Sequence, residues 1–419
     1  MPRTTGNYRN STVAGETVRA FVPSALPPAG PALRVEGPIE AACARAMAAV
    51  GRLEVAASLV PSTEWFLYGF VRKEAVLTSQ IEGTEATLRD VLEFEATDRT
   101  AHEDDVAEVC NYVEALTYAR RELAKPKGLP LSARLLCEAH RRLMRDAGTR
   151  RGGDKKPGTI RTSQNWVGGT RPGNARFVPP PADAVPGLLA DLDRWIHGRD
   201  PLPALVKAGL AHVQFETIHP FLDGNGRIGR LLITLLLEHW GVMRSPILYL
   251  SHSFKRHQRE YYDRLSAVRT DGDWEGWTRF YLACVDEAAE DGVSVAQRIF
   301  ALTAKDRGRL MSHTGATVAA IHLLDLLPSN PIVTVPRAAA LLGATAPTAR
   351  KAVEVLEEIG VLHETSGRQR DRVYAYQAYL QALTADEGRG KRASGLKPVR
   401  PGSLEAKQGP PRSRGGPFR

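Results

Sequence analysis

The stretch HPFLDGNGRIGR, from His219 to Arg230, decides the fold of this chain. Its inner part, GNGRIG, matches the G-x-G-x-x-G pattern of dinucleotide-binding folds. Such folds need a strand before the glycines and an acidic residue about 20 positions after them. The preceding LVKAGLAHVQFETI has the apolar spacing of a helix, and no Asp or Glu lies between Glu238 and Glu260. A dinucleotide fold is therefore excluded, and the sequence also lacks the G-x-x-x-x-G-K-[ST] of a P-loop.

The same stretch predicts two helices joined by an anion-binding loop. Residues 227–240, RIGRLLITLLLEHW, are apolar on nearly every face, so we expect a helix at the centre of a domain. Gly224 and Gly226 permit the backbone angles that point free amides at the helix start toward a phosphate. Arg227 and Arg230 lie three apart on the first turn, where their guanidinium groups can hold further phosphates.

Two further side chains of this loop indicate chemistry. Asp223 is badly placed among phosphates unless a divalent cation such as Mg²⁺ bridges them. His219, at the loop entrance, can accept a proton from a hydroxyl group. A lone His-Pro turn or a lone G-x-G is usually structural. Twelve residues that combine a base, a carboxylate, glycine amides and two arginines are hard to explain by packing alone.

The stretch resembles the HPFx[D/E]GNGRxxR signature of the Fic family and matches it at every specified position. The resemblance continues in PGTIRTSQNWVGG (157–169), FVPPP (177–181) and REYYDRLSAVRTDGDWEGWTRFYL (259–282), and covers roughly residues 10–290. It implies a mostly α fold, in which a helical Fic (fido) core carries a short β-hairpin flap.

The resemblance also implies an activity, the transfer of AMP from ATP to a Tyr, Ser or Thr hydroxyl of a target protein or of the chain itself. His219 would deprotonate that hydroxyl, and Asp223 would hold Mg²⁺ on the α- and β-phosphates. The backbone of Gly224, Asn225 and Gly226 would stabilise the charge that develops at the α-phosphate.

Further binding roles follow from the same resemblance. Arg227 would reach the β-phosphate and Arg230 the γ-phosphate. Tyr261 resembles a residue beside the nucleoside, although a plain core aromatic explains it almost as well. The flap would align the target segment by strand-like main-chain pairing. It comprises Asn165, Trp166, Val167 and Gly168.

The segment TSQIEG, which starts at Thr78, predicts a built-in inhibitor. Gly83 is typical of a helix end, and Thr84 would open the next helix. Glu82 then lies at the negative end of a helix, where a carboxylate is disfavoured unless it meets a cation. The segment resembles the [S/T]xxxE[G/N] inhibitory motif of the Fic family. We expect Glu82 to pair with Arg230 and to compete with the γ-phosphate.

Residues 316–384 resemble a winged helix-turn-helix, with three helical segments followed by the strand-like VLHET and RVYAY. The third helix carries Glu354, Glu357 and Glu358, so protein or dimer contact is favoured over DNA binding. The expected divisions are an N-terminal arm (1–36), an N-terminal helical region with the inhibitory motif (37–125), the Fic core (126–292), a linker helix (293–315), the winged-helix-like domain (316–384) and a disordered basic tail (385–419).

Composition agrees with a cytoplasmic protein of two or three domains. The net charge is +9, and residues 388–419 supply eight of these charges, so the remainder is nearly neutral. The four cysteines form no C-x-x-C pair and are expected to stay reduced. The N-terminus has no apolar core of a signal peptide, and the run LLITLLL is too short to cross a membrane.

Two classes of function stay open at this point. The first is a self-inhibited AMP-transferring enzyme whose partners are ATP and a protein, with a homodimer as a further option. The second is a DNA-binding regulator whose Fic domain senses a nucleotide. Within the enzyme class, transfer of another nucleotide or removal of AMP by a water that Glu82 positions are alternatives. The sequence does not name the target.

Overall fold

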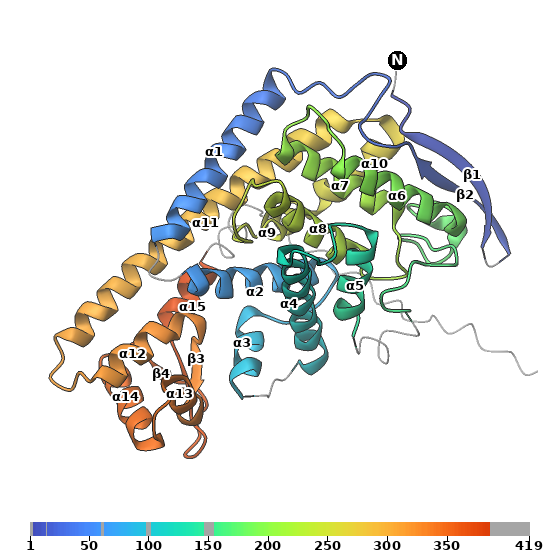
Figure 1. Cartoon of the computed structure of the whole chain (residues 1–419). Helices are drawn as coiled ribbons and strands as arrows, with labels where there is room; N and C mark the ends of the chain where they lie inside the picture. Colours follow the sequence, from blue (N-terminus) through green and yellow to red (C-terminus); the bar gives the residue numbers. More distant parts are fainter. Residues whose placement is uncertain (1–2, 14, 60–62, 98–101, 146–154, 386–419) are drawn as a thin grey trace, which may run out of the picture.

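The computed structural model describes residues 3–13, 15–59, 63–97, 102–145 and 155–385, and helices dominate them. Figure 1 shows a helical body flanked on one side by two long helices, with a small C-terminal module at one end and a β-hairpin at the other. Within the described residues, the helices are too short or too polar to span a membrane. All four cysteines lie in the described part and are free.

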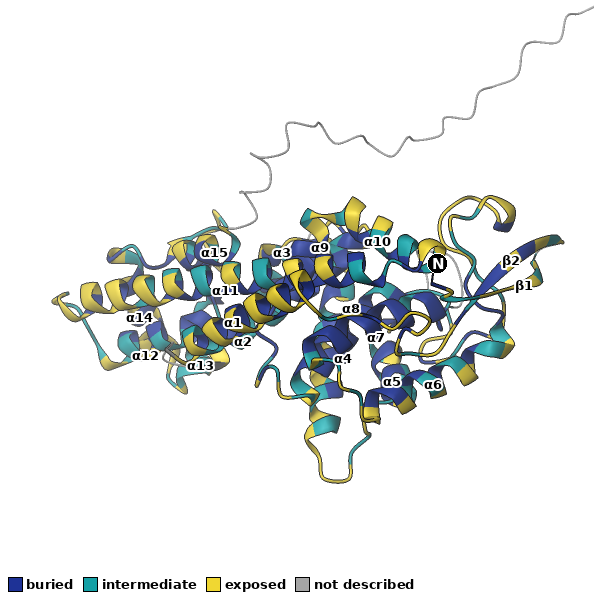
Figure 2. Cartoon of the chain, turned by 90° about the horizontal axis from the view of Figure 1, so that it is seen from above, coloured by how far each residue is buried: buried dark blue, intermediate teal, exposed yellow. Residues whose placement is uncertain are grey.

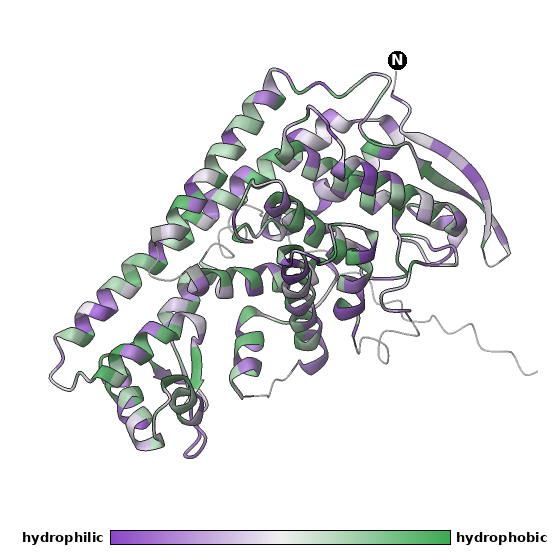
Figure 3. Cartoon of the chain, viewed as in Figure 1, coloured by the Kyte–Doolittle hydropathy of each residue, from purple (hydrophilic) through white to green (hydrophobic). Residues whose placement is uncertain are grey.

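Two helices, α7 (Ala204–Ile218) and α8 (Asn225–His239), occupy the centre of the body. Nearly all of their residues are buried, and Figure 2 shows both in the colour of buried residues. Figure 3 shows that they are also rich in hydrophobic residues. Because a helix that is apolar all round must be enclosed by others, the central position predicted for α8 is confirmed.

Other helices surround this pair. Those of the N-terminal region are α1 (Pro38–Leu59), α2 (Thr63–Ile81), α3 (Leu88–Thr97) and α4 (Glu103–Ala124). Those that follow are α5 (Ala133–Leu143), α6 (Val185–His197), α9 (Ser251–Arg256), α10 (Gln258–Asp271) and α11 (Trp274–Met311), with 3₁₀ turns η1 (Pro172–Asn174) and η2 (Ala182–Ala184). α4 packs against α2, α5 and α8, so the N-terminal region reaches the centre of the molecule.

The helix α11 is continuous over 38 residues, so the expected division at residue 292 between core and linker helix falls inside one element. Its start is fixed by Asp273, which accepts a hydrogen bond from the Gly276 N–H at 2.8 Å. α1 packs along it. Gly292 permits their close approach, because a Cβ at this position would lie 2.8 Å from Leu53 Cδ1.

Within the N-terminal arm (1–36), residues 6–23 form a β-hairpin that the sequence did not indicate. Strands β1 (Gly6–Val13) and β2 (Glu16–Pro23) pair antiparallel, with Ser11 opposite Val18. β2 buries Val18, Ala20 and Phe21 against the body, and the Phe21 N–H donates to Val178 O at 2.9 Å. The hairpin was missed because β1 has only one apolar aliphatic residue and shows no alternation.

The C-terminal module has the helices α12 (Val318–Leu326), α13 (Val335–Leu342), α14 (Ala346–Glu358) and α15 (Gln377–Thr384), with a 3₁₀ turn η3 (Leu327–Ser329). Its strands β3 (Ile332–Thr334), β4 (His363–Glu364) and β5 (Val373–Ala375) form one antiparallel sheet in the order β3-β5-β4. β3 was not foreseen. The winged-helix identity of the module stays a prediction, and the basic tail beyond residue 385 lies outside the described residues.

This module is docked onto α2. Lys73, which is fully buried on α2, donates from Nζ to Leu383 O of α15 at 2.7 Å. Its ammonium group also lies 4.3 Å from the centre of the Tyr249 ring. α2 therefore contacts the C-terminal module at η3 and α15, and its last turn carries Thr78, the first of the predicted inhibitory residues.

Candidate active site

The loop between α7 and α8 is held in one shape by its own residues. His219 ends α7 in the left-handed conformation with φ of 51°, and Gly224 precedes α8 with φ of 74°. Asn225 closes the loop, because its Oδ1 accepts from the Phe221 N–H and its Nδ2 donates to Phe221 O, both at 2.8 Å. The free amides at the start of α8 therefore directly follow a loop of fixed shape.

A histidine of α5 packs against this loop. The His140 ring stacks on Phe221 at a centroid distance of 3.8 Å. Its Nδ1 accepts from the Gly158 N–H at 2.8 Å, so its Nε2 carries the proton and donates to Asp223 O at 3.0 Å. Burial lowers the pKa of His140 to about 4, and the ring is therefore neutral. No sequence pattern indicated this residue.

A buried arginine joins the loop to the flap segment. Arg161 is 2% exposed and donates from Nε to His219 O at 2.9 Å. Its NH2 donates to Pro180 O at 2.5 Å and its NH1 to Ser163 O at 3.1 Å. Burial lowers its pKa to about 10, which leaves it charged at pH 7. Its guanidinium group thus donates to carbonyls of three segments that meet beside His219.

The His219 imidazole is poised to accept a proton. Its Nδ1 lies 3.3 Å from Glu216 O, so Nδ1 carries the hydrogen and Nε2 keeps its lone pair. Burial lowers the pKa of His219 to about 4, and the charges of Arg161 and Arg269 act in the same direction. The side chain is therefore a neutral base at physiological pH.

The predicted contact between Glu82 and Arg230 is present. Arg230 is 3% exposed, and its NH2 donates to Glu82 Oε1 at 2.5 Å. The Arg230 Nε donates to Thr78 Oγ1 at 2.6 Å, and NH2 also reaches Thr78 O at 3.1 Å. Burial lowers the pKa of Arg230, but the charge and hydrogen bond of Glu82, together with Tyr261 and Glu216, outweigh burial, and the net shift is upward. α2 ends before Glu82 and Gly83 has φ of 97°, the conformation expected at such an end.

Glu82 occupies the anion cradle itself. A Cβ built at Gly226 would lie 2.3 Å from Glu82 Oε1 and 3.1 Å from Arg230 NH1. The carboxylate therefore lies directly against the backbone of the first turn of α8, where a phosphate would bind. Thr84 does not open the next helix as expected. α3 begins at Leu88, because Thr87 and Asp90 exchange hydrogen bonds and cap it.

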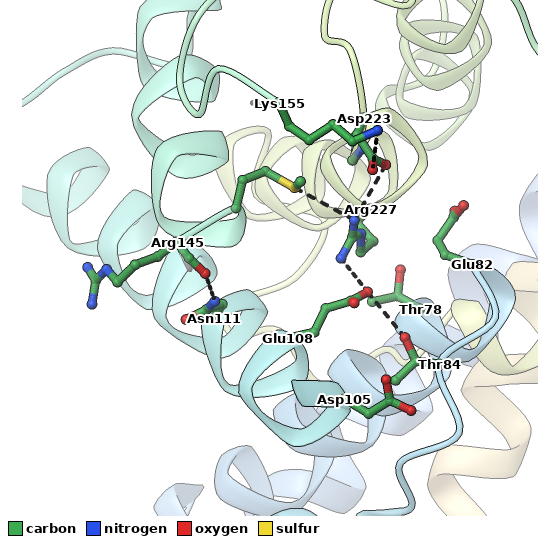
Figure 4. Close-up of polar contacts among 12 residues, drawn as sticks. Thr78, Glu82, Thr84, Asp105, Glu108, Asn111, Arg145, Lys155, Asp223 and Arg227 are labelled. Carbon is green, nitrogen blue, oxygen red and sulfur yellow. Dashed lines mark hydrogen bonds and ion pairs between the residues drawn. The ribbon is translucent and has the colours of Figure 1, made fainter. Parts of the chain in front are cut away.

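Arg227 is the second buried arginine of the cradle and is 4% exposed. Its NH1 donates to Glu108 of α4, while its NH2 lies 3.7 Å from Met144 Sδ and 3.8 Å from Asp223 Oδ1 (Figure 4). Glu108 had no signal in the sequence, since its pairing depends on how α4 packs against α8.

The surroundings of Asp223 fit a magnesium ion held together with phosphates. Its side chain is 39% exposed, its Oδ1 accepts the Gly224 N–H at 2.6 Å, and its Oδ2 lies 3.7 Å from Lys155 Nζ. The described residues contain no group of three or more His, Cys, Asp or Glu side chains that could enclose a metal by themselves. Mg²⁺ commonly takes one or two carboxylates and completes its shell with substrate phosphates and waters.

Two buried groups lie beside the cradle. The Glu216 Oε1 is buried without a hydrogen-bond partner among the described residues, and burial raises the pKa of Glu216 to about 7. Tyr261 is 1% exposed, stacks on Phe254 at 4.6 Å and shares a hydrogen bond of 2.8 Å with His212 Nε2. It therefore lies in the core here, and its predicted nucleoside contact stays a prediction.

The flap is reduced to one pair of antiparallel residues, Val167 and Phe177, whose two hydrogen bonds measure 2.8 and 3.1 Å. Asn165 ties it to the catalytic loop by donating to Phe221 O at 3.0 Å. Trp166 and Val167 are 37% and 36% exposed. Gly168 follows with φ of 68° and turns the chain. The alignment of a target segment by this flap stays a prediction.

Fold and site together define a helical protein in which the loop between two buried helices, α7 and α8, begins with a neutral histidine and is followed by two buried arginines. Residues 40–121 match the family model described as Fic/DOC family N-terminal, and residues 130–237 match the one described as Fic/DOC family. The chain therefore contains the N-terminal and Fic domains of the Fic/DOC family.

Individual relatives agree. A probable protein adenylyltransferase of Aquifex aeolicus is 39% identical over 69 residues, 16% of this chain and 22% of that protein. Protein adenylyltransferase Fic of Drosophila erecta is 27% identical over 215 residues, 50% of this chain and 39% of that protein. The chain thus matches less than half the length of either relative. A Fic family protein of Desulfovibrio desulfuricans has the same fold, with a TM-score of 0.55, 23% identity, and coverage of 82% of this chain and 97% of that chain.

Proposed function

We propose that this chain is a protein adenylyltransferase that transfers AMP from ATP to a Tyr, Ser or Thr hydroxyl of a target protein or of itself, and that Glu82 inhibits it. The contact that carries the proposal is the 2.5 Å hydrogen bond between Arg230 NH2 and Glu82 Oε1, inside the anion cradle of α8. A carboxylate held at a phosphate site by the cation of that site is a competitor of the phosphate. The names of the two relatives support the activity.

The described residues can perform each part of the transfer. The target hydroxyl gives its proton to Nε2 of His219, and its oxygen forms a bond to the α-phosphorus of ATP. The bond between that phosphorus and the oxygen bridging to the β-phosphate then breaks, and diphosphate leaves. The amides at the start of α8 face the charge that develops on the α-phosphate. Asp223 would hold Mg²⁺, which neutralises phosphate charge when bound.

The inhibition follows from competition for Arg230. While Glu82 holds its NH2, this guanidinium cannot take the γ-phosphate at the same corner. ATP therefore binds productively only in those molecules in which Glu82 has left the cradle, so the inhibition lowers the apparent affinity for ATP. Removal of the Glu82 carboxylate should therefore release transfer without changing the catalytic base.

Incubation of the purified full chain with Mg²⁺ and ATP labelled at the α-phosphate tests this proposal. We expect Glu82→Gly to incorporate more label than the unchanged chain and Glu82→Gly/His219→Ala to incorporate none. Glu85→Gly, which changes an exposed glutamate of the same loop, is the matched control and should behave as the unchanged chain. Label on the His219→Ala variant, or equal labelling with and without Glu82, would contradict the proposal.

The alternatives are separated by the same sample. Mass spectrometry of the modified chain identifies the transferred group, so another nucleotide would be recognised by its mass. Release of AMP from a previously modified chain would identify removal as the main reaction. The DNA-binding regulator has less support, because α14 exposes Glu354 and Glu358 beside Arg350 and Lys351.

A further inference from the structure

The helix α4 brings a carboxylate to an arginine of the catalytic motif. Glu108 lies between two donors, as Figure 4 shows: it accepts from Arg227 NH1 and, at 3.2 Å, from Thr84 Oγ1. The side chains of Arg227 and Glu108 are only 5% and 12% exposed. A charge-assisted hydrogen bond between groups so shielded from water fixes both side chains more firmly than a surface ion pair does.

The remaining donors of Arg227 have few contacts among the described residues. Its Nε is buried and has no hydrogen-bond partner among the described residues. Within the described part of the chain, the contacts of its NH2 are long, 3.7 Å to Met144 Sδ and 3.8 Å to Asp223 Oδ1. A guanidinium group offers five donors in a rigid fork, so one corner can be fixed by a carboxylate while another edge binds a phosphate.

We propose that Glu108 is a positioning residue that orients Arg227 toward the β-phosphate of the bound nucleotide; this inference rests on the proposed function. A free arginine side chain loses much rotamer freedom when it binds a ligand. Because Glu108 has already fixed Arg227, that loss does not oppose nucleotide binding. The N-terminal region then has two opposite actions on the site, since Glu82 blocks one arginine and Glu108 prepares the other.

The same helix holds the inhibitory loop in place. The Glu85 N–H donates to Asp105 Oδ2 at 2.8 Å, one helical turn before Glu108, which itself accepts from Thr84. α4 thus contacts the residues directly after Glu82 as well as Arg227. The position of α4 therefore affects the inhibitory loop in the inhibited state and Arg227 in the nucleotide-bound state.

Calorimetric titration with ADP and with AMP, each with Mg²⁺, tests the inference in the full-length Glu82→Gly variant. AMP lacks the β-phosphate, so only ADP should report on the orientation of Arg227. We expect Glu108→Gln to weaken ADP binding about tenfold, the usual coupling of groups in direct contact, and to leave AMP binding unchanged. The matched control is Glu114→Gln. Glu114 lies on α4 like Glu108 but forms an exposed ion pair with Arg145, so its replacement should change neither affinity.

A double variant shows whether Glu108 acts through Arg227. In the Arg227→Met background, Glu108→Gln should have no further effect on ADP binding. If Glu108→Gln does not fold, Thr84→Val removes only the second hydrogen bond of Glu108 and should weaken ADP binding by about two- to threefold.

An equal loss of ADP and AMP binding would overturn the inference, as would an effect of Glu108→Gln that persists without Arg227. Tighter ADP binding would also overturn it and would make Glu108 a second inhibitor. If the Glu82→Gly variant binds neither nucleotide and incorporates no label, the proposed function fails and the role of Glu108 fails with it. Label incorporation with unchanged ADP affinity in Glu108→Gln would refute the role of Glu108 alone.

Discussion

Replacing Glu82 by Gln keeps the size of the side chain and one acceptor oxygen but removes the charge that faces Arg230. Two unit charges about 4 Å apart near a protein surface interact by about 4 kcal/mol. Water screens part of this, because the Glu82 side chain is one-third exposed while that of Arg230 is 2% exposed. We therefore assign about 2 kcal/mol to the ion pair between Glu82 and Arg230. This corresponds to a factor of about thirty in the equilibrium between paired and free Arg230.

This magnitude sets the expected kinetics. If only about one molecule in thirty has a free Arg230, the apparent affinity for ATP falls by the same factor. Glu82→Gly should lower KM for ATP by about thirtyfold, and Glu82→Gln, which keeps a neutral hydrogen bond, by about fivefold. Initial rates of AMP incorporation over a range of ATP concentrations measure both. If Glu82→Gln has the same KM as the unchanged chain while Glu82→Gly is activated, charge competition is not the mechanism.

Three further results are expected. His219 should stay neutral between pH 6 and 8, so a change of transfer rate in this window should come from another group. Burial raises the pKa of Glu216 to about 7, so the change of rate should disappear in Glu216→Gln. A midpoint near 6.5 that persists in Glu216→Gln would contradict the lowered pKa of His219. Arg161→Met removes donors from buried carbonyls and should lower the melting temperature by roughly 5–10 °C, whereas Arg171→Met, at an exposed pair with Glu16, should not; equal melting temperatures would show that Arg161 is dispensable. Burial raises the pKa of Glu74 from 4.5 to about 7, so ionisation of this carboxyl lowers the free energy of unfolding as the pH rises between these values. Compared with the unchanged chain, Glu74→Gln should therefore gain about 3 kcal/mol in free energy of unfolding at pH 8 relative to pH 4.5. A gain that is independent of pH would contradict the raised pKa of Glu74.

The parts of the site that sequence could predict are those within continuous segments. The loop from His219 to Arg230 encodes its own geometry, because its glycines, Asn225 and the apolar helix after them act locally. The inhibitory segment was recognisable because a glycine after Glu82 indicates a helix end. The ion pair between Glu82 and Arg230 was predicted from the resemblance to the inhibitory motif, and this contact is present in the structure.

The supporting residues could not be predicted, since each acts across packed helices. In the sequence, Glu108 is one of several acidic residues in the polar first half of α4, and His140 is one of several polar residues near the end of α5. Neither position indicates a special role. Arg161 lay inside a segment that was singled out, but its burial depends on three chain segments that meet only in the folded molecule. No local pattern specifies these distances.

The docking of the C-terminal module has a consequence for how the protein can be divided. Lys73 is fully buried, and Leu383 O is one of its acceptors. A chain cut before α15 would lose that acceptor and would uncover apolar surface around Gly69, where a Cβ would lie 3.0 Å from Leu383 Cδ2. A buried ammonium that loses an acceptor weighs heavily against folding. α15 is thus a structural part of the body that contains α2, and a recombinant fragment that ends at the long helix α11 should be less stable than the full-length chain.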